Sequence, residues 1–145
     1  MKTKIAIGSD HAGYHLKEAI KAKFSNDYQW LDVGANTTDS VDYPDFGAAV
    51  AKKIIEGEAE KGIVICGSGI GISIAANRFP QIRAALCTDS TMARLSRQHN
   101  DANIVALGER LTGAEIAFDI VETFMKTSYE GGRHDKRVTK LSQLC

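Results

Sequence analysis

The chain has 145 residues, of which 43% are hydrophobic and 25% are charged, a composition that is ordinary for one globular domain of about 100–150 residues. Lysine and arginine together number 18, as do aspartate and glutamate, so the formal net charge is zero. We therefore expect a single domain over residues 1–145, and nothing in the overall charge favours binding to nucleic acid or to a membrane surface.

The chain carries no recognisable export or membrane segment. Its first apolar run, residues 5–7, is far shorter than a signal peptide requires, and no segment approaches the ~20 apolar residues of a membrane span. The three cysteines are an odd number without the spacing of a disulfide framework. We therefore expect a reducing, cytoplasmic location, with Cys87 in the core and Cys145 as an exposed thiol of the tail.

Five short apolar runs predict β-strands at residues 4–8, 30–33, 62–66, 83–87 and 103–107. Between them, apolar residues at helical spacing predict helices over about 14–24, 44–55, 70–79, 90–98 and 113–125. Thr112 is expected to cap the last of these helices, with Glu115 completing a capping box. The alternation predicts an α/β fold in which a parallel five-stranded sheet has helices on both faces. A polar tail follows from Ser128.

Ligands of such sheets bind beyond the carboxyl ends of the strands, so the residues that follow each strand are candidates for a site. Asp10 and His11 follow the first strand, where an acid and an imidazole could move protons on an oxygen substrate. Alternatively, Asp10 simply caps the next helix. His11 and His15 have a spacing that can hold a metal, but no further ligand pattern accompanies them.

Three glycines follow the third strand in the segment Cys66-Gly67-Ser68-Gly69-Ile70-Gly71. Exposed amides next to a helix N-terminus bind anions, either a phosphate or a developing oxyanion. The same dipoles favour the thiolate of Cys66. The segment is neither a Walker loop nor a complete Gly-x-Gly-x-x-Gly motif. The alternative is a structural cysteine beside a tight turn.

The remaining candidates lie near the fifth strand and in the tail. His99 and Asn100 precede that strand and could supply a proton donor and a hydrogen bond, or could belong to a solvated helix end. Their place at the amino end of the strand speaks against a functional role, although the preceding helix could end at a neighbouring subunit. Arg110 follows the strand, and Arg133 and Arg137 are spaced to share a helix face beside His134. These groups could bind phosphate or form an exposed basic face.

Taken in order, these segments resemble the B-type ribose-5-phosphate isomerase family, which includes related galactose-6-phosphate isomerases. The resemblance implies a Rossmann-like three-layer α/β/α sandwich that assembles as a homodimer or homotetramer. It implies active sites at the subunit interface, with residues 128–145 packing there. The implied reaction converts D-ribose 5-phosphate to D-ribulose 5-phosphate without a metal or cofactor. The resemblance rests on residues 8–13, 42–44, 66–77, 96–101 and 129–134.

The resemblance also implies a role for each candidate residue. Asp10 and His99 open the sugar ring, Cys66 removes the proton from C2, and Ser68 moves a proton between O1 and O2. Some members use a glutamate of the glycine loop as the base, but the matching position here is Ile72, which cannot act as one. Backbone amides of residues 67–71 stabilise the enediolate. The substrate-binding residues are then His11, Tyr43, Gly67, Gly69, Ile70, Gly71, Asn100, Arg110, Arg133, His134 and Arg137.

Other functions remain compatible with the same residues. An isomerase of a six-carbon sugar phosphate, such as allose or galactose 6-phosphate, would use the same chemistry in a longer pocket. A nucleotide-binding module could share the fold, although its glycine loop would be expected after the first strand rather than the third. A catalytically inactive interaction protein is a third alternative, which the presence of Asp10, Cys66 and His99 disfavours.

Overall fold

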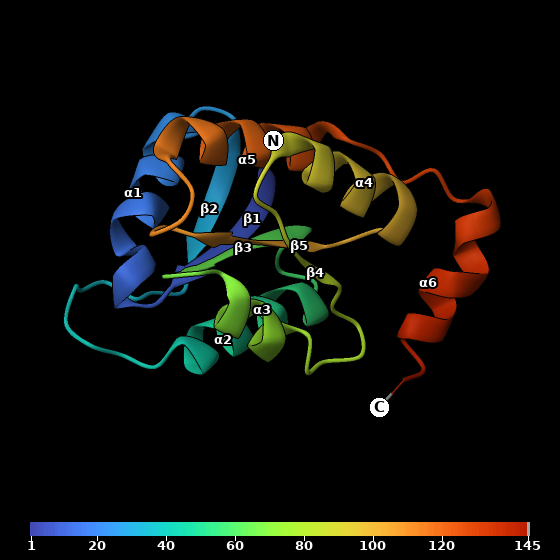
Figure 1. Ribbon diagram of the computed structural model, residues 1–145, viewed down its shortest axis with the longest axis horizontal. Coiled ribbons are helices and arrows are strands. Elements are labelled where there is room, and N and C mark those ends of the chain that lie inside the picture. The colour runs from blue at the N-terminus through green and yellow to red at the C-terminus, as the bar shows by residue number, and fades with distance from the viewer. Residues whose placement is uncertain (145) are drawn as a thin grey trace.

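A computed structural model describes residues 1–144 of the chain. Its sheet has five parallel strands in the order β2-β1-β3-β5-β4 (Figure 1). The strands are β1 (Thr3–Ser9), β2 (Tyr28–Asp32), β3 (Lys61–Cys66), β4 (Ala84–Leu86) and β5 (Ile104–Gly108).

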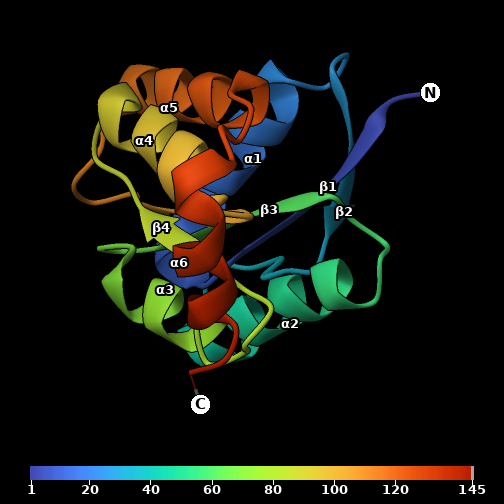
Figure 2. The ribbon, with the colours of Figure 1, turned by 90° about the vertical axis from the view of Figure 1, so that its right-hand side faces the viewer.

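Helices cover both faces of the sheet, and Figure 2 shows the resulting three layers. One layer contains α1 (Tyr14–Lys23), α4 (Ser90–Asn100) and α5 (Ala114–Lys126). The opposite layer contains α2 (Tyr43–Ile55) and α3 (Ile70–Ala76). The predicted three-layer α/β/α fold is thereby confirmed. Two short 3₁₀ turns, η1 (His11–Gly13) and η2 (Gly132–His134), and the last helix, α6 (Asp135–Leu141), complete the described chain.

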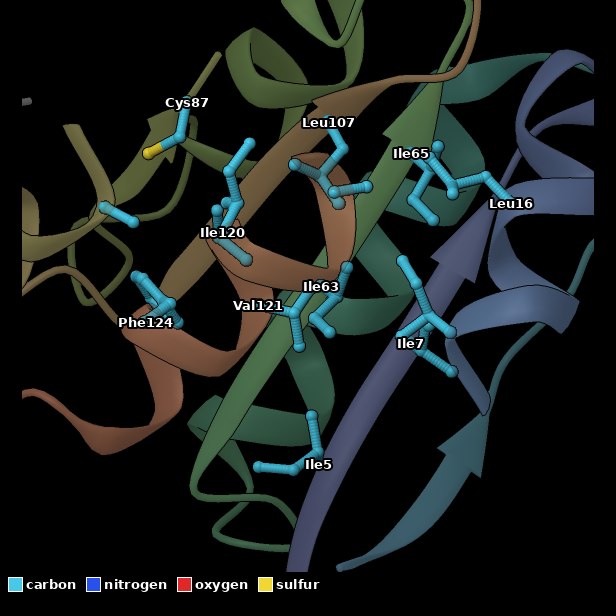
Figure 3. Close-up of a cluster of buried hydrophobic side chains, with 14 of the residues drawn as sticks. Ile5, Ile7, Leu16, Ile63, Ile65, Cys87, Leu107, Ile120, Val121 and Phe124 are labelled. Carbon is cyan, nitrogen blue, oxygen red and sulfur yellow. The ribbon is translucent and has the colours of Figure 1, made fainter. Parts of the chain in front are cut away.

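The two faces of the sheet support separate apolar cores. Ile5, Ile7, Ile63 and Ile65 point towards the layer of α1 and α5, where they pack with residues such as Phe124 (Figure 3). Their neighbours along the same strands, such as Ala6 and Val64, belong to the core beneath α2 and α3. This alternation follows from the two-residue period of a strand. Burial on both faces makes the central strands a rigid support for the residues at their ends.

Several element boundaries differ from the expectation. The helix expected to end near residue 79 ends at Ala76. The proposed cap at Thr112 is wrong, because α5 begins at Ala114 with Gly113 as its N-cap and no side-chain cap hydrogen bond. Thr112 belongs instead to the turn after β5, where its N–H donates to the Gly108 carbonyl at 2.9 Å.

The tail departs from the three layers. Arg133 lies in η2 and Arg137 lies in α6. The two arginines therefore do not lie on one continuous α-helix, as their spacing had suggested. No residue of α6 is buried. The helix stands to one side of the layers in Figure 1 and crosses in front of them in Figure 2.

The expectation for Cys87 is confirmed, because this side chain is buried in the core. Cys145 lies outside the described residues. Within residues 1–144, no helix combines the length and the apolar character that a membrane crossing requires.

A buried lysine ties α1 to the end of β2. The Lys17 side chain is fully buried, and its Nζ lies 2.7 Å from Oδ2 of Asp32. Lys21 Nζ contacts the same oxygen at 2.7 Å, while Asp32 Oδ1 accepts the Gly34 N–H at 2.8 Å. Burial alone would raise the pKa of Asp32, but the hydrogen bonds from Lys17, Lys21 and Gly34 outweigh it and lower that pKa below its ordinary value. Asp32 therefore holds both α1 and the start of the loop that leads to α2.

Replacing Asp32 by asparagine should reduce the free energy of unfolding by about 3 kcal/mol, since it leaves the buried Lys17 ammonium without its main counter-charge. The value lies at the low end for a broken buried pair because Glu18 Oε2 remains 3.3 Å from Lys17. Urea denaturation at neutral pH measures the change. Glu58→Gln, which removes the exposed pair with Lys53, is the matched control and should leave the midpoint unchanged. Equal midpoints for the two variants would contradict this account of Asp32.

Candidate active site

The predicted residues divide into two groups at opposite edges of the sheet. The first group surrounds a pocket of about 320 Å³ at the carboxyl ends of β1, β3 and β5. This volume lies in the range usual for small-molecule sites. The pocket is lined by Asp10, Tyr43, Cys66, Gly67, Ser68, Gly71, Arg110 and Leu111.

The glycine loop after β3 is packed against the end of β5. Gly69 has a φ of +79°, and a Cβ there would lie 2.8 Å from the carbonyl carbon of Leu107. A Cβ on Gly108 would lie 2.5 Å from the backbone of Ser68. Both contacts are shorter than a side chain permits, so only glycines let these two backbones approach. The loop is held at a fixed position relative to Cys66, the last residue of β3.

Cys66 is almost fully buried, and its sulfur accepts a hydrogen bond from the Gly69 N–H at 3.1 Å. A backbone donor at this distance stabilises negative charge on the sulfur. The neighbouring Ser68 Oγ accepts the N–H of Ile70 at 3.1 Å, which leaves the hydroxyl proton available for donation. With the Gly69 and Ile70 amides engaged in this way, the amides of Gly67, Ser68 and Gly71 are the loop donors left for an anion.

Asp10 lies on the other side of the pocket, on the turn that follows β1. Its Oδ1 accepts the Gly13 N–H at 3.1 Å, and its own N–H donates to the Ile65 carbonyl at 3.2 Å. A Cβ on Gly13 would lie only 2.7 Å from that carbonyl oxygen, so the turn rests directly on β3. Asp10 thus forms a capping hydrogen bond, but this bond caps the 3₁₀ turn η1 and not the expected helix α1, whose N-cap is Gly13. The bond does not exclude proton transfer, because Oδ2 takes no part in it.

His11 is oriented by the loop that joins β2 to α2. Its Nδ1 accepts the Val41 N–H at 3.1 Å. In the neutral imidazole this contact assigns the proton to Nε2, which can then donate to a ligand. The His11–His15 pair gains no third metal ligand within residues 1–144.

Tyr43 and Arg110 form the rim of the pocket by covering two glycines. A Cβ on Gly71 would lie 2.6 Å from Cζ of the Tyr43 ring, and a Cβ on Gly67 would lie 3.2 Å from Nη1 of Arg110. The rim also contains Leu111, which sequence reasoning missed and which is 69% exposed. Sequence reasoning missed Leu111 because an apolar side chain beside Arg110 carries no group that would indicate binding or catalysis.

The second group lies at the amino edge of the sheet and consists of His99, Asn100, Arg133, His134 and Arg137. α4 returns antiparallel to the strands, and Asn103, three residues after its end, accepts the Gly62 N–H near the start of β3. From Lys61 to Cys66 the strand spans about 16 Å. The structure therefore does not bring His99 to Asp10 and Cys66 of its own chain.

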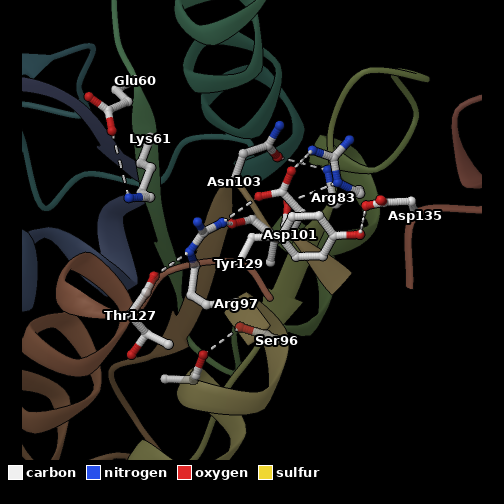
Figure 4. Close-up of polar contacts among 12 residues, drawn as sticks. Glu60, Lys61, Arg83, Ser96, Arg97, Asp101, Asn103, Thr127, Tyr129 and Asp135 are labelled. Atoms are coloured by element: carbon white, nitrogen blue, oxygen red, sulfur yellow. Dashed lines mark hydrogen bonds and ion pairs between the residues drawn. The ribbon is translucent and has the colours of Figure 1, made fainter. Parts of the chain in front are cut away.

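A network of polar contacts around Arg97 joins the start of the tail to the end of α4, which carries His99 and Asn100 (Figure 4). Arg97 donates from Nη1 to Asp101 Oδ1 at 3.0 Å and to the Ala102 carbonyl at 2.6 Å, and from Nε to the Thr127 carbonyl at 3.1 Å. The Glu130 N–H donates to the Gln98 carbonyl at 3.1 Å. These bonds fix the tail against the end of α4.

Imidazole rings from the two segments meet within this second group. The rings of His99 and His134 stack with centroids 4.6 Å apart, and Glu130, which sequence reasoning missed, contacts both of them. The meeting of these residues depends on how the tail folds back, which no local pattern in the sequence indicates.

A larger hollow of about 420 Å³ lies between α4 and α5. It is lined by Ser90, Asp119, Glu122, Thr123, Lys126 and Thr127. It contains neither a thiol nor an imidazole, and a glycine loop does not border it. The pocket that contains Cys66 is therefore the stronger candidate for catalysis.

Comparison with known proteins identifies the family over nearly the whole chain. The family model described as Ribose/Galactose Isomerase matches residues 5–141. Ribose-5-phosphate isomerase B of Escherichia coli is 44% identical over 142 residues, which are 97% of this chain and 95% of that protein.

Solved structures of similar proteins share the fold. Ribose-5-phosphate isomerase B of Clostridium thermocellum is 56% identical, with a TM-score of 0.96 over 97% of this chain and 96% of that one. The type B ribose 5-phosphate isomerase of Trypanosoma brucei is 46% identical, with a TM-score of 0.94 over 99% of both chains.

The two described cysteines, Cys66 and Cys87, should differ sharply in their reactivity towards alkylating reagents. Burial raises the pKa of Cys87 to about 11, so only about one in a thousand of these thiols is ionised at pH 8. Cys66 borders the pocket and has a backbone donor to its sulfur. Iodoacetamide at pH 8 should therefore modify Cys66 and spare Cys87, as peptide mass mapping would show. Equal modification of both residues in the folded protein would contradict the contrast between their environments.

Proposed function

The chain belongs to the ribose/galactose isomerase family, and we propose that it interconverts D-ribose 5-phosphate and D-ribulose 5-phosphate through an enediolate. The observation that carries this proposal is the pocket that Cys66, Asp10 and the glycine loop line together. It contains a nucleophilic sulfur, a carboxylate and loop amides around one small cavity, which are the groups that an aldose–ketose isomerisation requires.

The sugar ring must open first. A base removes the proton of the C1 hydroxyl while an acid protonates the ring oxygen, so the bond between C1 and that oxygen breaks and the C1 aldehyde forms. Asp10 and His99 are the proposed acid–base pair. Asp10 is held by its cap hydrogen bond with one oxygen left for the substrate. His99 is partly exposed at the opposite edge of the sheet, where a partner's substrate can reach it.

Isomerisation then moves one proton between carbons. The Cys66 thiolate removes the proton from C2, and the electron pair forms the C1–C2 double bond while negative charge develops on O1. Ser68 carries the proton of the C2 hydroxyl from O2 to O1, so the charge moves to O2. As the C2 carbonyl forms, C1 takes the proton back from the Cys66 thiol. Ile72 cannot replace Cys66 as the base, because it is an aliphatic side chain buried in the core.

The enediolate charge needs donors that are in place before the reaction. We assign this role to the amides of Gly67, Ser68 and Gly71, while the Gly69 N–H stabilises the Cys66 thiolate. Gly69 and Ile70 hold the loop in its shape, and Tyr43 and Asn100 are placed at the sugar hydroxyls. Removal of one such donor typically costs about 2.7–4 kcal/mol of transition-state stabilisation.

The position of His99 supports a homodimer, or a homotetramer built from such dimers, with each site completed by the partner chain. His11 and Arg110 of one chain and Arg133, His134 and Arg137 of the other are the proposed phosphate ligands. α6, which has no buried residue, and the rest of residues 128–145 supply this contact. Residues 1–145 then form one domain whose tail packs on a second copy.

The proposed chemistry uses neither a metal nor a cofactor, because proton transfer by side chains accounts for every step. It also requires Cys66 as a free thiol, which supports a reducing cytoplasmic location. Among substrates, the five-carbon sugar phosphate is favoured by relatives that are named for ribose 5-phosphate. The six-carbon sugar phosphates are the alternative to be compared.

Cys66→Ala should lower kcat by at least about a thousandfold, because it removes the group assigned to take the proton from C2. The formation of ribulose 5-phosphate from ribose 5-phosphate is measured for wild type and variant in EDTA. Circular dichroism checks the fold, and Cys87→Ala is the matched control with a thiol removed outside the pocket. Wild-type turnover in Cys66→Ala would refute the base assignment, and loss of wild-type activity in EDTA would refute metal independence. Faster turnover of allose or galactose 6-phosphate would replace the proposed substrate.

Two inactive variants should complement each other if each site uses both chains. Cys66→Ala and His99→Asn are co-expressed and purified together. In a random mixture half of the dimers are mixed, and each mixed dimer has one intact site, so activity should reach about a quarter of wild type. Each variant alone should stay inactive. No recovery in verified mixed dimers would show that Cys66 and His99 act without sharing a site between chains.

A further inference from the structure

Three potential metal ligands converge where the tail meets the end of α4. Glu130 Oε1 lies 3.5 Å from Nε2 of His134 and 3.9 Å from Nε2 of His99. One ligand atom from each of the three residues can be chosen so that all lie within 4.8 Å of one another. Ligands of a tetrahedral zinc ion lie about 3.3 Å apart at Zn–N distances of 2.0–2.1 Å. Small side-chain rotations therefore suffice to form the site.

The His134 nitrogen provides an independent sign of a missing ligand. The residue is 6% exposed, yet its Nε2 has no hydrogen-bond partner among the described residues. The contact with Glu130 does not meet hydrogen-bond geometry and is an ion pair only when the imidazole is protonated. A buried polar atom without a partner is costly. A cation bound between the imidazoles and the carboxylate would satisfy it.

The backbone around these ligands is already in place. The Glu130 N–H is bound to the Gln98 carbonyl, one residue before His99. Arg97 binds the Thr127 carbonyl and Asp101, which ties the residue after α5 to the residue after α4 (Figure 4). Tyr129 donates to Asp135 Oδ1 at 2.8 Å, which fixes the turn that carries Glu130 and His134. A metal would therefore need to reorganise three side chains and little of the backbone.

We propose that His99, Glu130 and His134 bind one divalent transition-metal ion of the zinc type and that the bound ion inhibits the enzyme. Two imidazoles and one carboxylate are a ligand set for zinc, with a fourth position left for water. The inhibition rests on the proposed function, because a metal on Nε2 takes the nitrogen with which His99 would transfer its proton. These three residues do not line the Cys66 pocket of their own chain. In the proposed dimer they adjoin the partner's pocket, and the bound ion serves no step of the reaction.

Metal binding is tested first without reference to activity. The protein used is the Cys66→Ala/Cys145→Ser variant, which lacks the two cysteines that could compete for the ion. Zn²⁺ is titrated into it in competition with a chromophoric chelator. We expect one Zn²⁺ per chain and an affinity at least about tenfold lower after Glu130→Gln or His134→Ala. Glu122→Gln, on the exposed face of α5, is the matched control and should bind like its parent. Co²⁺ should give the visible spectrum of a four-coordinate site without a thiolate charge-transfer band.

Inhibition is tested in the wild-type protein. Zn²⁺ should abolish ribose 5-phosphate isomerisation and EDTA should restore it, whereas Glu130→Gln should retain basal activity and resist Zn²⁺ at least about tenfold better. Affinity that is unchanged by both ligand substitutions would refute the site, and binding without inhibition would refute its effect on His99. If the metal-free wild-type protein has no activity on any sugar phosphate, the proposed function is refuted. The chelator titration would still decide whether the metal site exists.

Discussion

The parallel arrangement of the five strands is the constraint on which the rest of the molecule depends. All strands end at one edge, so the residues after β1, β3 and β5 become neighbours although they are far apart in sequence. Asp10, Cys66 and Arg110 reach one pocket for this reason. The helices must return to the other edge, and α4 carries His99 there. One chain thus presents a thiol and a carboxylate at one edge and stacked imidazoles at the other. Pairing of two chains can bring the first edge of one chain to the second edge of its partner.

Close contacts between backbone segments fix the geometry of the pocket. The glycine loop touches the end of β5 through Gly69 and Gly108, where a single Cβ would collide with main-chain atoms. Such contacts leave no side chain to change rotamer, so the loop amides are fixed relative to the Cys66 sulfur. Buried strands on both faces hold the whole edge. Catalysis by donors that are positioned in advance depends on this kind of rigidity.

The sequence carries the architecture clearly because the patterns behind it are local. Apolar runs and helical spacing predicted the five strands and the helices α1 to α5, with boundaries that shifted by a few residues. The Thr112 cap was wrong because the turn after β5 takes one residue more than the capping pattern assumed. Lys17 was not foreseen as a buried charge, since its partner Asp32 lies on another element. Glu130 was missed because its two histidines meet only when the tail folds against α4.

The proposed catalytic roles of His99 and His134 and the proposed metal site make the same demand on the two imidazoles. The proton transfer proposed for His99 needs a ring nitrogen that no protein donor or acceptor occupies, and the His99 side chain is 39% exposed. His134, if it binds phosphate, must also keep a nitrogen free, and its Nε2 has no hydrogen-bond partner among residues 1–144. Two free imidazole nitrogens beside the Glu130 carboxylate satisfy the requirements of a sugar phosphate site and of a zinc site alike. Under these two proposals, sensitivity to zinc follows because the imidazole nitrogens that the substrate needs are also available to a metal ion.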